Sequence, residues 1–332
     1  MLIEELREKY PKHWENATAI RVLTLDAVAA ANSGHSGMPM GMADVATVLF
    51  FNHLKFDPKA PLWPDRDRLI LSAGHGSMLL YSLLYLTGYE DFPLDEIKQF
   101  RQLGAKTAGH PENFLSDAIE TTTGPLGQGI ANSVGFAMAE EIQRANFGDS
   151  IVDHFTYVFA GDGCLMEGVS QEAITLAGRQ KLSKLIVFWD NNNITIDGKV
   201  ELSDSTNQVE RFKSAGWHVC EIDGHNPVEI NQAILEAKKS NKPTMIACKT
   251  HIALGSSAQD TSKGHGALTD RILIEETKKV YGWSQENFHV PTKVKKEWEE
   301  IGKKGQKERL SWEGDFALLS LKKQLEFSRM YS

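Results

Sequence analysis

The 332-residue sequence contains only three cysteines, and their placement argues against a disulfide framework. Cys164, Cys220 and Cys248 are widely separated along the chain and form no Cys-x-x-Cys pair. An odd number would also leave one thiol unpaired in any bridged state. We therefore expect a reduced, cytoplasmic compartment.

Long hydrophobic runs are also absent. The longest apolar stretch, around residues 79–86, is too short to span a bilayer. The first residues are acidic and lack the apolar core of a signal peptide. We expect neither export nor membrane insertion.

The chain has no excess of positive charge. It carries 36 Lys and Arg against 44 Asp and Glu, a net charge of -8, and the basic residues are scattered. We therefore expect no nucleic-acid or membrane partner, and any anionic ligand must be held locally. The hydrophobic content of 41% is that of an ordinary globular protein, long enough for one large domain or two modest ones.

Short apolar runs alternate with helical patterns over most of the chain. Runs typical of buried strands occupy residues 69–71, 157–160, 185–189, 217–222 and 244–249. Helical patterns occupy residues 17–31, 77–86, 94–101, 130–144, 169–177, 209–214 and 227–239. Strands that are apolar on both faces and alternate with helices predict an α/β fold, in which helices flank a parallel sheet on both faces.

The pattern changes near residue 284. Beyond it the strand signals stop, and residues 290–332 carry mixed charge in a pattern typical of helix. We predict a metal- and diphosphate-binding α/β domain over residues 1–283. Residues 284–332 would form a helical linker or C-terminal arm instead of a second domain.

Two polar turns follow neighbouring predicted strands. Gly161-Asp162-Gly163 ends one strand, and Asp190 to Asn193 ends the next. A strand, crossover helix and parallel strand take about 30 residues, so Asp162 and Asn192 should lie side by side at the carboxyl edge of the sheet. Ligands bind at that edge in open α/β folds. A carboxylate and an amide carbonyl suit a divalent cation that keeps water or phosphate oxygens.

The residues around Asp162 also suit a diphosphate. The flanking glycines let it approach the backbone, and a helix predicted to start near Leu165 would direct free N–H groups at it. Taken alone, Gly-Asp-Gly is more simply a tight turn and the asparagine run a polar loop. The spacing between the two turns favours a metal-diphosphate site.

A glycine-rich segment at residues 121–129 precedes the predicted helix at 130–144. Pro125 stiffens the turn, and its glycines open a wall where a flat ring or a phosphate can come close. The segment matches neither a Walker A loop nor Gly-x-Gly-x-x-Gly. A plain helix-entry loop explains it nearly as well.

Histidine follows glycine unusually often. Five of the eleven histidines do so, whereas the glycine content predicts about one. Glycine lets an imidazole reach a ligand from a loop, and imidazole trades protons near neutral pH. Each histidine taken alone is better explained as a loop residue whose hydrogen bonds are made within the protein. No two of them show the short spacing of zinc ligands. Several together favour a catalytic role. They are His35, His75, His110, His225 and His265.

Six segments in the same order resemble the transketolase family, and the resemblance extends over most of the chain. They include Ser33-Gly-His-Ser-Gly-Met-Pro-Met, Gly109-His-Pro-Glu, Gly124-Pro-Leu-Gly-Gln-Gly and Gly161-Asp-Gly-Cys-Leu-Met-Glu-Gly, with residues 71–76 and 190–198. The resemblance implies a thiamine diphosphate-binding fold. It also implies a dimeric enzyme of the pentose phosphate pathway that transfers two-carbon ketol units between sugar phosphates, with carbanion chemistry supplied by the cofactor.

The resemblance assigns roles residue by residue. Asp162 and Asn192 would bind Mg²⁺, or Ca²⁺, with their side chains, and Ile194 with its backbone carbonyl. The residues that would hold thiamine diphosphate are His75, Gly124, Pro125, Leu126, Gly163, Asn192 and His265. Substrate binding and proton transfer would fall to His35, His110 and His265. Glu167 matches a glutamate at the subunit interface, although a first-turn helix residue favoured by the dipole explains it too.

One departure from the family is large. Its aminopyrimidine-activating glutamate and its sugar-phosphate-binding basic groups lie in a second domain, and nothing after Ser284 resembles that domain. We expect the chain to need a pyrimidine-binding domain or a complementary subunit for activity. The segment 288–332 resembles the interdomain linker of one-chain transketolases, which slightly favours a portion of a longer enzyme over a naturally split subunit.

Other functions share parts of the pattern. Deoxyxylulose phosphate synthase and dihydroxyacetone synthase contain the same metal motif, although the His-Pro-Glu and Gly-Pro-Leu-Gly-Gln-Gly segments favour transketolase. A non-catalytic cofactor-binding module that has kept the fold is a further alternative.

Overall fold

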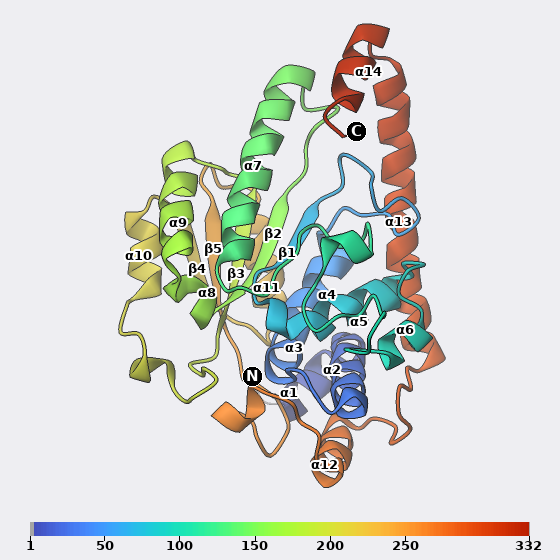
Figure 1. Ribbon diagram of the computed structural model, residues 1–332, viewed down its shortest axis with the longest axis vertical. Helices are drawn as coiled ribbons and strands as arrows, with labels where there is room; N and C mark the ends of the chain where they lie inside the picture. Colours follow the sequence, from blue (N-terminus) through green and yellow to red (C-terminus); the bar gives the residue numbers. More distant parts are fainter. Residues whose placement is uncertain (1–2, 332) are drawn as a thin grey trace.

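The computed structural model describes residues 3–331, and its centre is a five-stranded, all-parallel sheet (Figure 1). The strand order is β1-β2-β3-β5-β4. The predicted α/β fold with a parallel sheet is thereby confirmed. The strands are β1 (Arg68–Leu71), β2 (Thr156–Gly161), β3 (Leu185–Asn191), β4 (His218–Asp223) and β5 (Thr244–Lys249).

The interior strands are apolar on both faces because helices cover both. The helices are α1 (Ile3–Lys9), α2 (Pro11–Ala31), α3 (Gly37–Gly41), α4 (Ala43–Asn52), α5 (Ser77–Thr87), α6 (Leu94–Lys98), α7 (Gln128–Phe147), α8 (Asp162–Met166), α9 (Gly168–Gln180), α10 (Gln208–Ser214), α11 (Pro227–Ala237), α12 (Arg271–Tyr281), α13 (Thr292–Ala317) and α14 (Leu321–Ser328). Side chains of β2, β3 and β5 are almost entirely buried, whereas the edge strand β4 is half-buried.

Strand order explains which face each helix covers. The chain moves one way along the sheet from β2 to β3 and the opposite way from β4 to β5. Right-handed crossovers therefore place α9 and α11 on opposite faces. Helix α7 packs on β1, β2 and α9, while α11 packs on β4 and α4, as Figure 1 shows.

Several element boundaries differ from the sequence predictions, among them those of two helices. The helix expected over 94–101 ends at Lys98, because the chain turns and Arg101 takes a left-handed conformation with φ 60°. The helix expected near Leu165 instead begins at Asp162 and is only five residues long, and α9 starts afresh at Gly168. Asp162 therefore occupies the first position of a helix instead of the loop before one.

The C-terminal segment is helical, as predicted, and it packs along the main body (Figure 1). Val294, Trp298 and Ile301 of α13 belong to the main hydrophobic core. Phe327 of α14 is buried in a small separate cluster with Phe147. The division at residue 283 stays a prediction.

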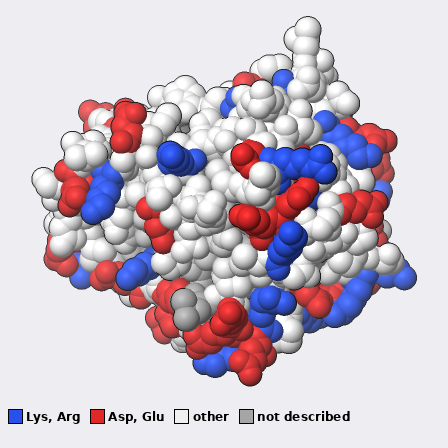
Figure 2. Space-filling view, turned by 90° about the horizontal axis from the view of Figure 1, so that it is seen from below, with Lys and Arg blue, Asp and Glu red and all other residues white. Residues whose placement is uncertain are grey.

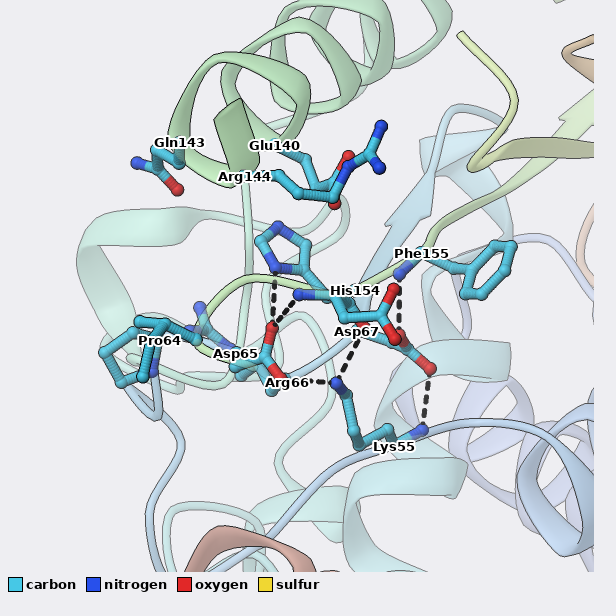
Figure 3. Close-up of polar contacts among 12 residues, drawn as sticks. Lys55, Pro64, Asp65, Arg66, Asp67, Glu140, Gln143, Arg144, His154 and Phe155 are labelled. Carbon is cyan, nitrogen blue, oxygen red and sulfur yellow. Dashed lines mark hydrogen bonds and ion pairs between the residues drawn. The ribbon is translucent and has the colours of Figure 1, made fainter. Parts of the chain in front are cut away.

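A polar cluster ties together the amino ends of β1 and β2 (Figure 3). The Asp67 carboxylate accepts backbone hydrogen bonds from Lys55 N at 2.8 Å and Phe155 N at 2.7 Å. Asp65 pairs with Lys55 Nζ at 2.6 Å and with His154 Nδ1 at 3.3 Å. These contacts satisfy backbone donors that the strands leave free, so they fix the end of the sheet opposite the predicted site.

All three cysteines are free thiols; Cys164 and Cys248 are buried, and Cys220 is half-buried. Within residues 3–331, every helix is too short or too polar to cross a bilayer.

Candidate cofactor and metal site

The predicted site residues meet in one pocket at the carboxyl ends of β2 and β3. Gly161 of β2 lies opposite Asp190 of β3 in the parallel register, so Asp162 and Asn192 leave the sheet next to each other. Both line a pocket of about 290 Å³. Other predicted residues in its wall are His35, His75, His110, Gly124, Leu126, Gly163, Ile194 and His265.

The Asp162 carboxylate lines this pocket and is buried. Its side chain is 8% exposed, and Oδ1 accepts a hydrogen bond from Trp189 Nε1 at 3.1 Å. Burial, together with the charge of nearby Asp190, raises the pKa of Asp162 to about 7. A cation between these groups would offset both effects, so the position suits a metal ligand.

The Asn192 amide is oriented by its neighbours. Nδ2 donates to Asp190 Oδ2 at 2.9 Å, and Oδ1 accepts from Ile194 N at 2.9 Å. Asp190 also accepts a hydrogen bond from Thr250 Oγ1. Burial raises the pKa of Asp190 to about 7. Both contacts agree on which end of the amide carries the oxygen, a hard donor with a second lone pair to spare.

A tight hairpin holds Ile194. Asn193 adopts a left-handed conformation with φ 63°, and its carbonyl accepts from Val200 N at 3.0 Å. Thr195 N then donates to Gly198 O at 2.7 Å. Asparagine tolerates this backbone better than most residues, which explains its use at the turn.

Three histidines form a compact cluster in the wall of the pocket. The rings of His35, His75 and His265 lie 5.0 to 5.4 Å apart, centroid to centroid. Burial, followed by the charge of His265, lowers the pKa of His75 to about 3 and that of His35 to about 4. Burial also lowers the pKa of His265. The cluster is therefore neutral at pH 7, and each ring can donate one hydrogen bond and accept another.

One ring nitrogen of this histidine cluster makes no hydrogen bond within the described residues. Nδ1 of His35 is buried and has no hydrogen-bond partner among residues 3–331, and the same holds for Oγ1 of Thr123 in the glycine-rich loop. Buried polar atoms are rarely left unpaired, and since His35 lines the pocket, its Nδ1 offers a contact to a bound ligand.

His110 also lines the pocket and lies against Gly124 of the glycine-rich loop. A Cβ on Gly124, whose φ is +148°, would come within 3.2 Å of the His110 ring. A Cβ on Gly163 would lie 2.9 Å from Leu126 Cδ1. Burial and the charge of Arg101 lower the pKa of His110. Both glycines thus keep the wall thin enough for a ligand to approach the backbone.

The residues that line the pocket and the predicted site residues differ at a few positions. Pro125 does not line the pocket in the described part of the chain, although both its neighbours do, and His225 lies in a separate buried network. The apolar wall formed by Met38, Ile196 and Ile252 was not anticipated. Ile252 in particular has no local signal, because only the packing of its loop against Gly37 brings it to the pocket.

The three proposed metal ligands all present oxygen atoms, and only one of them, the Asp162 carboxylate, carries a charge. Within residues 3–331 no group of three or more His, Cys, Asp and Glu is arranged to hold a metal ion. One carboxylate with one amide and one backbone carbonyl leaves positions open for water or phosphate oxygens, which suits Mg²⁺ or Ca²⁺. Figure 2 shows basic and acidic residues interspersed over the face seen from below.

Comparison with known proteins identifies the family. The family model described as transketolase, thiamine diphosphate binding domain, matches residues 12–330. The chain belongs to the transketolase family. A transketolase from Rhodobacter capsulatus is 58% identical over 330 residues, which are 99% of this chain and 49% of that protein. One from Sinorhizobium medicae is 52% identical over 90% of this chain and 43% of its own length.

Solved transketolase structures share the fold. The crystal structure from Campylobacter jejuni superposes with a TM-score of 0.93 at 43% identity, covering 96% of this chain and 50% of that one. A Pichia stipitis transketolase in complex with sedoheptulose 7-phosphate gives 0.89 at 46% identity, covering 92% and 46%. The chain therefore spans about half the length of the transketolases it matches and corresponds to their thiamine diphosphate-binding domain.

Proposed function

We propose that this chain supplies the diphosphate- and metal-binding half of a transketolase that transfers two-carbon ketol units between sugar phosphates. The observation that carries the proposal is the convergence of Asp162, Asn192 and the histidine cluster on one pocket. Asp162, Asn192 and the Ile194 carbonyl would hold Mg²⁺, or Ca²⁺. His75, His265, Gly163 and the Gly124-Pro125-Leu126 loop would hold thiamine diphosphate, which supplies the carbanion chemistry when bound.

The residues of the pocket fit this cofactor in charge and shape. Asp162 and Asp190 are both buried carboxylates, and the negative charge of Asp190 acts on Asp162. A divalent cation bound beside them would neutralise this negative charge. The glycine positions leave room for a diphosphate against the backbone, and the unpaired Nδ1 of His35 offers a contact to a ligand. Neutral His35, His110 and His265 can bind sugar hydroxyls and move protons.

The partners of the site follow from the length comparison. The matched transketolases are about twice as long, so we propose that a pyrimidine-binding domain or complementary subunit completes the pocket. A homodimer or higher assembly in the cytoplasm, in the pentose phosphate pathway, would be the working form. The sugar phosphate bound to the Pichia stipitis transketolase supports the substrate class.

Calorimetry tests the cofactor site directly. Thiamine diphosphate is titrated into the 332-residue chain with Mg²⁺, with Ca²⁺, or with EDTA. We expect metal-dependent binding that Asp162→Ala abolishes and Asp117→Ala, at an exposed position, preserves. Equal binding by wild type and Asp162→Ala would refute the assignment.

A coupled assay tests the activity. With xylulose 5-phosphate and ribose 5-phosphate, the chain alone should show no turnover, and addition of the C-terminal half of a related transketolase should restore it. Robust turnover by the chain alone would refute the need for a partner. Cofactor binding without activity in the complemented mixture would instead support a non-catalytic module.

A further inference from the structure

A buried carboxylate outside the pocket is contacted by three side chains, two from α2 and one from the loop between β4 and α11. Asp44 of α4 is fully buried and pairs with Arg21 of α2. Its Oδ1 contacts His13 Nε2 at 2.9 Å, and its Oδ2 contacts His225 Nδ1 at 2.8 Å. Burial would raise the pKa of Asp44, but the charge of Arg21 and the hydrogen bonds of His13 and His225 outweigh it and hold the pKa well below its usual range.

The hydrogen bonds of His225 define its tautomer. His225 lies between β4 and α11 and is 1% exposed. Its Nε2 accepts a hydrogen bond from the backbone N of His251 at 3.0 Å. That nitrogen therefore carries no proton, so Nδ1 carries it and donates to Asp44. The His225 ring also stacks on the His251 ring at 5.6 Å.

His251 belongs to the segment that leaves β5 and reaches the pocket. The preceding residue, Thr250, donates through Oγ1 to Asp190, the residue that orients the Asn192 amide. Thr250 N also donates to Asn191 O at 3.3 Å. His251, which is held by His225, therefore directly follows Thr250 in the chain. Thr250 in turn contacts Asp190, the residue that orients the proposed metal ligand Asn192.

The same segment continues to a pocket histidine. Ala253 N donates to Gly37 O at 3.1 Å, and a Cβ on Gly37 would lie 2.3 Å from Gly264 O. The next residue is His265. Because the segment is closely packed, it has little freedom to shift. The hydrogen bond at His251 therefore affects the positions of both Thr250 and His265.

We propose that Asp44 and His225 are positioning residues, which hold the segment 250–265 so that Thr250 keeps its hydrogen bond to Asp190 and His265 faces the cofactor. This inference rests on the proposed function. The carboxylate fixes the tautomer of the imidazole, and the imidazole holds the His251 N–H. Outer contacts of this kind set the direction of metal ligands, and small misplacements are costly.

A matched pair of substitutions separates the two contacts of His225. His225→Asn places an N–H near the Nδ1 position but has no acceptor that reaches His251. His225→Gln places an acceptor near the Nε2 position. We expect His225→Asn to weaken Mg²⁺-dependent thiamine diphosphate binding by about 10- to 100-fold, and His225→Gln to regain most of it. The control is His53→Asn, at a half-buried histidine paired with Asn231 outside this network.

Thermal midpoints without cofactor show whether each variant is folded. Unchanged binding by folded His225→Asn would overturn the proposal. A second measurement needs no variant: nitrogen-15 NMR of the cofactor-free wild type should show the Nδ1–H tautomer at His225, and an Nε2–H tautomer would also overturn it. If wild type binds no cofactor, the proposed function fails, while the NMR result still decides whether Asp44 orients His225.

Discussion

Asn192 donates its amide hydrogen to Asp190 at 2.9 Å, and this contact decides which end of the Asn192 side chain carries the oxygen. Asp190 can accept that bond and the bond from Thr250 Oγ1 because an ionised carboxylate offers two acceptor oxygens. The proposed metal ligand is thus oriented by a residue that need not touch the metal.

Substitution of Asp190 by asparagine should therefore weaken metal-dependent cofactor binding. An Asn at position 190 has one acceptor oxygen for two donors, so the Asn192 amide loses its fixed direction. We expect about a 10- to 100-fold loss of thiamine diphosphate affinity in Mg²⁺, measured by calorimetry. Asp197→Asn, at an exposed position of the same loop, should bind as wild type does. Wild-type affinity in Asp190→Asn would contradict this role.

Two glycine substitutions should change stability in opposite directions. Gly124 has φ +148°, and a Cβ there would crowd the His110 ring. Gly124→Ala should lower the free energy of unfolding by about 1–3 kcal/mol and weaken cofactor binding. Gly135 of α7 faces open space, so Gly135→Ala should raise stability by up to about 1 kcal/mol. Urea unfolding of both variants checks the pair, and a fully stable Gly124→Ala would show that this backbone position is not constrained.

The polar cluster at the amino ends of β1 and β2 predicts a pH effect. Burial raises the pKa of Asp67 to about 6, against the opposing influence of Lys55 and two backbone hydrogen bonds. A raised carboxyl pKa contributes stability that is present below the unfolded value near 4 and is lost as pH rises through about 6. Asparagine cannot titrate, so Asp67→Asn removes this loss.

The unfolding free energy of Asp67→Asn should therefore rise more steeply with pH between about 4 and 6 than that of wild type. The difference accumulated over this window should be up to about 3 kcal/mol. Urea unfolding at several pH values measures it, with exposed Asp95→Asn as the control. Parallel pH profiles would rule out the shift. Cofactor affinity should stay unchanged, because Asp67 lies at the opposite end of the sheet.

Much of the site was predictable because parallel strands end at a common edge. The sequence places Asp162 and Asn192 directly after successive buried strands, and adjacent pairing of β2 and β3 is enough to bring them together. The glycine-rich loop and the glycine-histidine pairs add groups of recognisable chemistry. Four of the five such histidines do line the pocket.

The order of the remaining strands was not predictable in the same way. The chain between β3 and β4 is long enough to place β4 beside β3, yet β5 takes that position. This choice brings Thr250 against Asp190 and His251 against His225. Burial, not local spacing, selects it, because β5 is apolar on both faces and β4 is not.

The sequence by itself therefore determined the α/β class, the family and the residues at the ends of β2 and β3, since these depend on local periodicity and short spacing. Only the tertiary structure decided that His225 contacts Asp44 instead of lining the pocket, and that Ile252 lines the pocket. Those outcomes depend on loops far apart in the chain packing against one another, and close packing has no signature in local sequence.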